Sequence, residues 1–174
     1  MKLNVYEKEN ITKIKVLMVC HGNICRSTMA ESVLAYMVKQ RHIDHLFEIY
    51  SAATSREEIG NGPHYGTVSK LRQKNIPVVP HRAVQMTKAD YEHYDYLIGM
   101  DSANIRNMNR IAEGDPDGKI YKLLCFAGYE TNHQLAAGRD VADPRYTGDF
   151  EATYQDVIAG CEGFLQFLKE EGKL

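Results

Sequence analysis

The chain has 174 residues, which is enough for one domain with a full hydrophobic core. Its hydrophobic content of 44% and charged content of 25% are those of an ordinary soluble globular protein. A formal net charge of -2 gives no strong attraction to nucleic acid or to an anionic membrane, and the sequence shows neither a signal peptide nor a long apolar run. We therefore expect the four cysteines to be reduced thiols in a cytoplasmic protein that binds neither nucleic acid nor membrane.

Apolar runs and helical periodicity divide the chain into strands and helices. Residues 1–13 carry neither a turn nor a cap signal, and we interpret them as an N-terminal arm that precedes a single domain at residues 14–174. Short apolar runs predict four strands, at 14–19, 47–51, 95–100 and 119–124. A 3.6-residue apolar period or a capping signal predicts helices at 27–41, at 64–75, after Thr87, after Asp101 and at 149–171.

Strands that alternate with helices predict an α/β fold, a sandwich in which helices flank a parallel sheet. No internal repeat, low-complexity tract or linker interrupts the pattern, so one domain is expected. In such sheets, ligands bind beyond the carboxyl ends of the strands. The loop after the first strand and the segments 51–55 and 100–104 all follow strands, so we expect a site where they meet.

The segment 20–27, with the sequence Cys-His-Gly-Asn-Ile-Cys-Arg-Ser, joins the first strand to the first helix. Backbone N–H groups of such a glycine-bearing loop converge on one point, and the helix N-terminus adds partial positive charge that suits an oxyanion. The same field favours the thiolate of Cys20, and Arg26 can add two parallel hydrogen bonds to a tetrahedral anion. A nucleophile and an anion site so close in sequence predict covalent transfer of a phosphoryl-like group.

Attack of a thiolate on a phosphate monoester expels an alkoxide, which needs a proton from a general acid. Asp143 precedes a proline in the connection between the last strand and the last helix, which belongs at the same end of the sheet as the cysteine loop. Asp143 is therefore the leading candidate for the acid, and for the base that later activates a water molecule. The competing interpretation is an ordinary Asp-Pro turn.

The segment 20–27 resembles the phosphate loop of low molecular weight protein-tyrosine phosphatases in its spacing from cysteine to arginine and serine. Further matching segments stand in the order of that family at 51–55, 60–63, 81–83, 100–106 and 143–151. The resemblance implies a three-layer sandwich with a four-stranded parallel sheet in the strand order 2-1-3-4. It also implies a protein-tyrosine phosphatase without metal or cofactor, a monomer or weak dimer that binds phosphate or a similar oxyanion and acts on phosphotyrosine-bearing proteins.

The roles of individual residues follow from the same resemblance. Cys20 is then the nucleophile, Arg26 binds the phosphate and stabilises the transition state, and Asp143 is first acid and then base. Ser27 matches the hydroxyl donor to the thiolate, and Asn23 matches the residue that holds the loop in a left-handed turn. The residues expected to bind the substrate are His21, Gly22, Asn23, Ile24, Cys25, Ser27 and Tyr146, the last at an aromatic wall of the mouth.

The mouth of the expected site departs from the family pattern at two places. Arg145 stands where an aromatic residue usually follows Asp-Pro, and the segment 56–58, Arg-Glu-Glu, stands where mammalian members carry a tryptophan. The loss of stacking surface weakens a preference for phosphotyrosine, whereas Arg145 can attract acidic residues that flank the substrate. The alternative is that these charged side chains simply face water.

In the same family, the cysteine at the Cys25 position can trap an oxidised nucleophile as a disulfide. We therefore predict that mild peroxide inactivates the protein reversibly through Cys20 and Cys25. The alternative for Cys25 is small-residue packing under the loop. Cys125 and Cys161 lie in apolar patterns and are expected in the core. No spacing of histidines and cysteines resembles a zinc site, so no metal is expected.

Four other functions compete with this prediction. A protein-arginine phosphatase of the same fold resembles Cys-x-Gly-Asn-Thr-Cys-Arg, and Ile24 at the position of the threonine favours a phosphate ester instead. An arsenate reductase needs two relay cysteines, and the chain has none between Cys25 and Cys125. From a different class come a non-catalytic phosphate-binding module, which stays the second alternative, and a phosphocysteine carrier of a sugar transport system. A carrier has no use for an arginine and a general acid placed to release phosphate, and both Arg26 and Asp143 are present.

Overall fold

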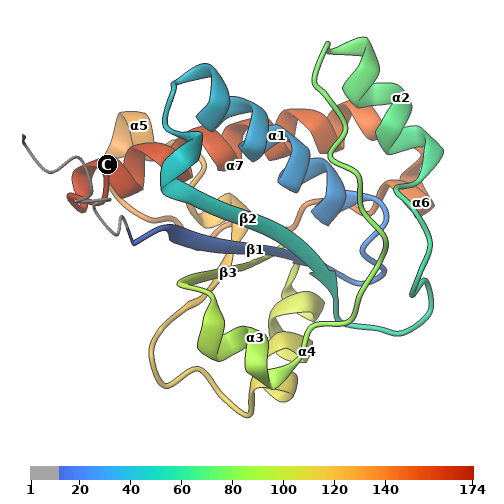
Figure 1. Ribbon diagram of the computed structural model, residues 1–174, viewed down its shortest axis with the longest axis horizontal. Helices are drawn as coiled ribbons and strands as arrows, with labels where there is room; N and C mark the ends of the chain where they lie inside the picture. The colour runs from blue at the N-terminus through green and yellow to red at the C-terminus, as the bar shows by residue number, and fades with distance from the viewer. Residues whose placement is uncertain (1–11) are drawn as a thin grey trace, which may run out of the picture.

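A four-stranded parallel sheet in the order β2-β1-β3-β4 forms the centre of the computed structural model, which describes residues 12–174 (Figure 1). The strands are β1 (Ile14–Cys20), β2 (Phe47–Ala53), β3 (Tyr96–Gly99) and β4 (Ile120–Lys122). The predicted fold class and strand order are thereby confirmed. The predicted N-terminal arm at 1–13 lies almost entirely outside the described residues.

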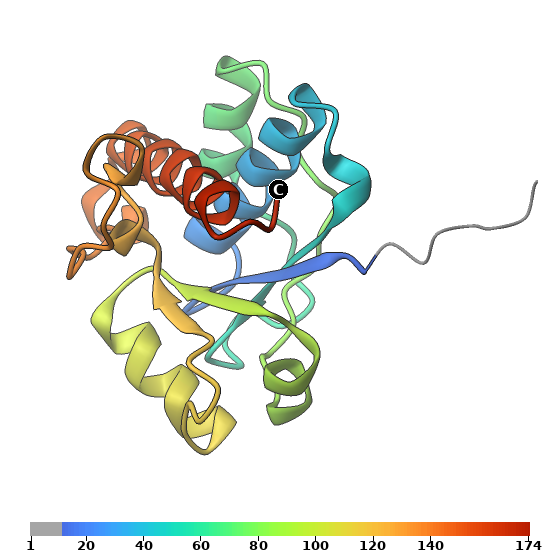
Figure 2. The ribbon, with the colours of Figure 1, turned by 90° about the vertical axis from the view of Figure 1, so that its left-hand side faces the viewer.

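Helices cover both faces of the sheet and complete the three layers, as Figure 2 shows from the end of the sheet. One face carries α1 (Arg26–Gln40), α2 (Tyr65–Gln73) and α7 (Phe150–Glu170). The other face carries α3 (Lys88–His93) and α4 (Ser102–Ala112). Short helices lie in the connections: α5 (Tyr129–Asn132), α6 (Pro144–Thr147) and the 3₁₀ helices η1 (Asp44–Leu46) and η2 (Leu123–Cys125).

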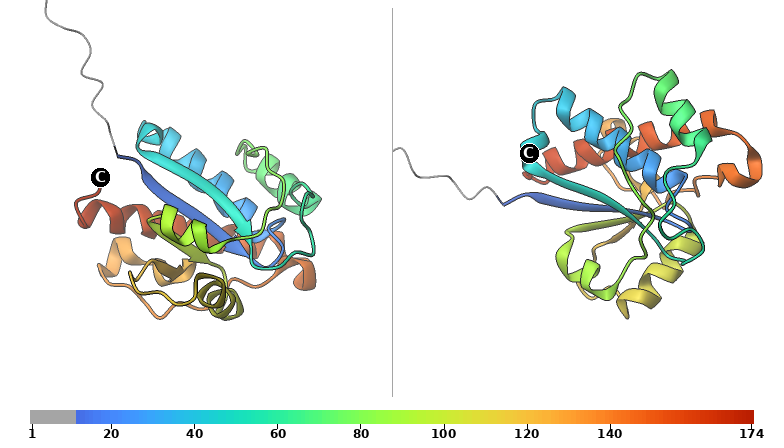
Figure 3. Two further views of the ribbon diagram at one scale, coloured as in Figure 1. Left: turned by 60° about the horizontal axis from the view of Figure 1, so that its bottom comes forward. Right: turned by 45° about the vertical axis from the view of Figure 1, so that its right-hand side comes forward.

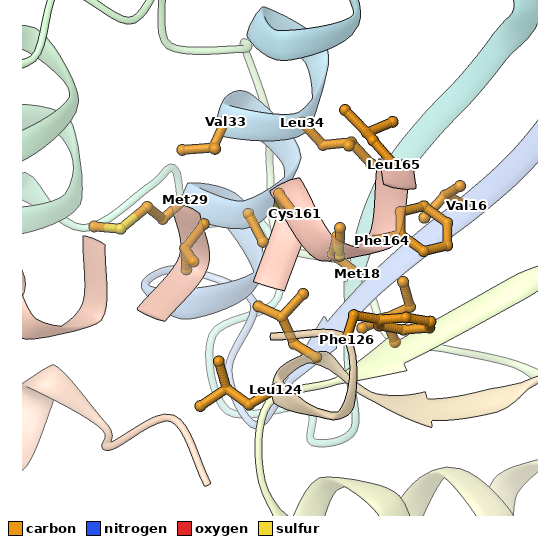
Figure 4. Packing of buried hydrophobic residues seen from close by; sticks show 14 of the residues in the cluster. Val16, Met18, Met29, Val33, Leu34, Leu124, Phe126, Cys161, Phe164 and Leu165 are labelled. Atoms are coloured by element: carbon orange, nitrogen blue, oxygen red, sulfur yellow. The ribbon is translucent and has the colours of Figure 1, made fainter. Parts of the chain in front are cut away.

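Strand β1 lies between β2 and β3, and it is buried on both faces because helices cover each of them. Val16 and Met18 point to one face and pack against residues of α1 and α7, among them Phe164 (Figure 4). Leu17 and Val19 point to the opposite face and belong to a second cluster with residues of α3 and α4. Since the strand ends at Cys20, the core itself fixes the position of the first residue of the cysteine loop.

The predicted strand at 119–124 is shorter in the structure than in the prediction. β4 has three residues, after which the chain turns into η2, although Leu123 is apolar and fully buried. The reason lies in α7, where a Cβ added to Gly160 would stand 2.5 Å from Leu123 and one added to Gly163 would stand 1.8 Å from the carbonyl oxygen of Phe126. These two glycines let the segment pack directly on the helix instead of continuing in the sheet.

The predicted helix caps at Thr87 and Asp101 are present. Thr87 forms a capping box with Asp90, and Asp101 forms one with Asn104. The connection between β4 and α7 was predicted to be a polar loop, but it contains α5 and α6. Each of these helices is four residues long, which is too short to leave an apolar period in the sequence.

Candidate active site

The loops that follow β1 and β2 meet the α6 segment at the carboxyl end of the sheet (Figure 3). Two backbone hydrogen bonds join the first two loops, from the Thr54 N–H to the Cys20 carbonyl (2.9 Å) and from the Ser55 N–H to the His21 carbonyl (3.0 Å). The end of β3 contributes Asp101 to the same place. The expected meeting of segments that follow different strands is therefore confirmed.

Cys20 is the first residue of the loop, and only 3% of it is exposed. Its sulfur lies 3.0 Å from the Ser27 hydroxyl and accepts a hydrogen bond from the Asn23 backbone N–H at 3.3 Å. Both groups can donate to a thiolate, and the N-terminus of α1 begins a few residues away. This environment stabilises negative charge on the sulfur.

Asn23 holds the loop in shape. Its backbone has φ of 60°, the left-handed conformation that asparagine tolerates better than most residues. Its side-chain amide donates to the hydroxyls of Ser27 and Ser51, each at 2.9 Å, while its carbonyl oxygen accepts from the Val84 N–H at 3.2 Å and lies 2.5 Å from the His81 ring. The fully buried amide thus joins the loop to β2 and to the segment that follows α2.

The buried side chain of Glu31 contacts two partners of the Asn23 amide, Ser51 and His81. Glu31, on α1, accepts a hydrogen bond from the Ser51 hydroxyl at 2.6 Å and lies 3.7 Å from the ring of His81. Burial raises the pKa of Glu31 to about 7, against the opposing hydrogen bond from Ser51, and burial lowers the pKa of His81. Sequence reasoning missed Glu31 as a member of the site, and it placed the segment 51–55 there without a role for Ser51. The one available signal was an acidic residue inside the small and apolar run 29–34.

Arg26 is held in place by groups on two sides. One guanidinium nitrogen donates to Asp101 at 2.7 Å and to the Val141 carbonyl at 2.8 Å, and another lies 3.5 Å from the carboxylate of Asp143. Burial alone would lower the pKa of Arg26, but negative charge on Cys20 and the carboxylates of Asp101 and Asp143 raise it. The guanidinium therefore stays charged, and it is fixed before any anion arrives.

Asp143 serves as a helix cap and also faces the cysteine loop. One of its carboxylate oxygens accepts from the Arg145 N–H at 3.0 Å and caps α6, whose first residue is Pro144. The other oxygen lies on the side of Arg26. The predicted Asp-Pro turn is thus real, and the turn is what aims the carboxylate at the site.

One pocket brings most of the predicted residues together. It is lined by Cys20, His21, Gly22, Ile24, Cys25, Arg26, Asp143 and Arg145. Asn23 and Ser27 are fully buried behind it, where they support the loop rather than line the pocket. Tyr146 is 90% exposed and stands outside the pocket wall.

The two charged departures from the family pattern meet at the mouth of the pocket. A guanidinium nitrogen of Arg145 lies 3.8 Å from a carboxylate oxygen of Glu58, and the His21 ring lies 3.0 Å from Glu57. A Cβ added to Gly22 would stand 3.3 Å from Glu58 and 3.6 Å from Arg145, so the pair lies directly over this glycine. These side chains therefore form part of the rim instead of pointing independently into water.

All four cysteines are free thiols. Burial, assisted by negative charge on Cys20, raises the pKa of Cys25 to about 12. Burial likewise raises the pKa of Cys125, in η2, to about 11, and Cys161 is fully buried in α7, so the expectation that these two belong to the core is confirmed. The disulfide between Cys20 and Cys25 stays a prediction.

Within residues 12–174, no helix combines the length and apolar character needed to cross a membrane. Over the same residues, no three side chains among histidine, cysteine, aspartate and glutamate are grouped so that they could hold a metal ion.

Residues 15–174 match the family model described as low molecular weight phosphotyrosine protein phosphatase. The chain is 39% identical over 160 residues to the human low molecular weight phosphotyrosine protein phosphatase, covering 91% of this chain and 97% of that protein. The crystal structure of YfkJ from Bacillus subtilis superposes with a TM-score of 0.84 at 35% identity, covering 92% of this chain and 97% of that one. A Drosophila arginine phosphatase superposes with a TM-score of 0.77 at 28% identity, covering 89% and 98%. The chain belongs to the low molecular weight phosphotyrosine protein phosphatase family.

Proposed function

We propose that this protein hydrolyses phosphotyrosine in protein substrates through a phosphocysteine intermediate. The observation that carries the proposal is a single pocket lined by a cysteine thiol, a pre-positioned arginine and a carboxylate, namely Cys20, Arg26 and Asp143. These are the three groups that the hydrolysis of a phosphate monoester by covalent catalysis requires.

In the first step, the phosphate occupies the pocket with its oxygens facing the loop N–H groups and Arg26. The Cys20 thiolate attacks phosphorus, the S–P bond forms and the P–O bond to the tyrosine breaks. Asp143 gives its proton to the departing phenolate oxygen. The Asp143 carboxylate then takes a proton from a water molecule, whose oxygen attacks phosphorus; the S–P bond breaks, and inorganic phosphate and the Cys20 thiolate are released. Ser27, 3.0 Å from the sulfur, stabilises the thiolate that is regenerated.

Ile24 supports an ester substrate over a phosphoramidate. It lines the pocket with its branched apolar side chain and is largely buried there. Such a side chain suits an aromatic leaving group and offers nothing to a charged guanidinium. Because a Drosophila arginine phosphatase has the same fold, phosphoarginine is the competing substrate that the experiment must include.

The test measures phosphate release from para-nitrophenyl phosphate and from phosphotyrosine, phosphoserine and phosphoarginine peptides. We expect phosphotyrosine to be preferred, Cys20→Ser to abolish turnover, and Asp143→Ala to lower kcat by about 10²–10⁴-fold. Cys125→Ser, a change at another buried thiol, is the matched control and should keep activity. Turnover that survives in Cys20→Ser would refute the mechanism, and faster hydrolysis of phosphoarginine would replace phosphotyrosine as the substrate.

A further inference from the structure

A second depression lies beside the catalytic pocket, between α2 and α6. Its volume is about 410 Å³, and residues of α2, α6 and the start of α7 line it. Figures 1 and 3 show α2 and α6 next to each other at the end of the molecule that carries the cysteine loop. Tyr65 and Phe150 supply an aromatic surface, and Lys70 and Arg145 supply positive charge. We call this feature the α2–α6 groove.

Arg145 lines both the catalytic pocket and the α2–α6 groove. Its backbone N–H donates to the carboxylate of Asp143, so its Cα has a fixed position relative to the proposed catalytic acid. The guanidinium therefore lies between the catalytic pocket, where the phosphate would bind, and the α2–α6 groove, where the neighbouring residues of a substrate chain would bind.

The guanidinium of Arg145 has fewer and longer polar contacts with the protein than the ammonium group of Lys70, the other cation of the groove. Lys70 is held by Glu151 at 2.9 Å and by Gln73 at 2.7 Å. Among residues 12–174, Arg145 has one ionic partner, Glu58 at 3.8 Å, and its side chain makes no hydrogen bond. A separation of 3.8 Å is beyond a direct hydrogen bond, so five N–H donors remain free for a planar carboxylate.

The aromatic floor of the groove has a fixed shape. A Cβ added to Gly66 would stand 2.3 Å from the ring of Phe150, so the glycine is what allows this ring to lie against α2. Tyr65 is largely exposed on the same side. Glu57 and Glu58 stand at the rim beside Arg145 and carry the negative charge of the mouth.

We propose that the α2–α6 groove binds the substrate chain next to the phosphotyrosine and that Arg145 selects an aspartate or glutamate there. The carboxylate takes the place of Glu58 as the partner of Arg145, and Glu58 competes for the guanidinium until the substrate arrives. This inference rests on the proposed function because it assumes a phosphorylated protein chain as substrate.

The experiment compares phosphotyrosine peptides that carry glutamate or glutamine at one flanking position at a time. We expect kcat/KM at the preferred position to favour glutamate by about fivefold, the upper range for an exposed ion pair, and to lose this preference at high salt. Arg145→Gln, which keeps the backbone N–H that donates to the Asp143 carboxylate, should bring the ratio to about one. Glu58→Gln should raise it about twofold because a competitor is removed. Arg110→Gln, which neutralises an exposed arginine of α4, is the matched control and should leave the ratio unchanged.

A glutamate-to-glutamine ratio of one at every position, or an unchanged ratio in Arg145→Gln, would overturn the assignment of the groove. Failure of the proposed function looks different, because phosphotyrosine peptides would then not be hydrolysed at all. In that case, the same ratio is measured on phosphoarginine peptides with the same flanking residues, and it decides the role of Arg145 by itself.

Discussion

Replacement of Asn23 is the sharpest test of how the cysteine loop is held. In Asn23→Ala, the loop loses the four side-chain contacts of the amide, and alanine must adopt the left-handed backbone at φ of 60°. Two of the four partners, the Ser27 and Ser51 hydroxyls, keep other hydrogen bonds to Cys20 and Glu31. The main losses are therefore at the Val84 N–H, on a half-exposed residue, and at the His81 ring, which keeps the Ser51 hydroxyl at 3.4 Å, so each costs about 1 kcal/mol.

The left-handed backbone adds about 1 kcal/mol for alanine. We therefore expect Asn23→Ala to lower the free energy of unfolding by about 3 kcal/mol, and Asn23→Gly by about 1 kcal/mol less because glycine adopts this backbone freely. Urea denaturation with a shared m-value measures both differences, and kcat on para-nitrophenyl phosphate should fall in both variants. A loss under about 1 kcal/mol in Asn23→Ala would refute the view that the amide network holds the loop.

Three further predictions follow from other contacts. Gly163→Ala should lower the free energy of unfolding by about 3 kcal/mol or more, and the thermal midpoint with it, because its Cβ would stand 1.8 Å from the carbonyl oxygen of Phe126. An unchanged midpoint would contradict this packing. Glu151, whose pKa is lowered to about 2 by hydrogen bonds from the two lysines beside it, should stabilise the fold above pH 4.5 and lose this effect as the pH falls toward 2. Thermal melts of Glu151→Gln should therefore show a small deficit at neutral pH that disappears in acid. After mild peroxide, the Cys20–Cys25 disulfide should close about tenfold faster per pH unit above neutrality, because burial raises the pKa of the Cys25 thiol well above this range and the thiolate fraction then grows with pH. Mass spectrometry of alkylated samples measures this, with Cys25→Ser as the control.

The central part of the site is predictable from sequence because its chemistry is local. The proposed nucleophile, the arginine and the helix start lie within the segment 20–27, and the strand before Cys20 is largely apolar. The proposed acid is distant in sequence, but the topology of a parallel sheet brings Asp143 to the same end. Both inferences need only periodicity, strand order and residue chemistry.

The buried residues that hold the site in position are not predictable from periodicity, strand order and residue chemistry. A glutamate on a helix is normally read as a solvent-exposed residue, and only the contact of Glu31 with Ser51, twenty positions along the chain, shows that it is buried. Asp101 was predicted as a cap of α4, which is correct, but its second contact with Arg26 depends on tertiary structure. The apolar residues of η2 have the pattern of a strand, and their true position depends on a glycine of α7, Gly160.

The geometry separates the chemistry of the site from its selectivity. The groups assigned to phosphate hydrolysis are fixed by buried contacts, since Arg26 lies between two carboxylates and Asn23 anchors the loop to β2. At the rim, by contrast, the side chains of Arg145 and Glu58 are partly exposed and form an ion pair with a separation of 3.8 Å. Exposed pairs of this type contribute little to stability, so the rim can change with little effect on the fold. Substrate preference can therefore vary through Glu58 and Arg145 while the cysteine loop stays as it is.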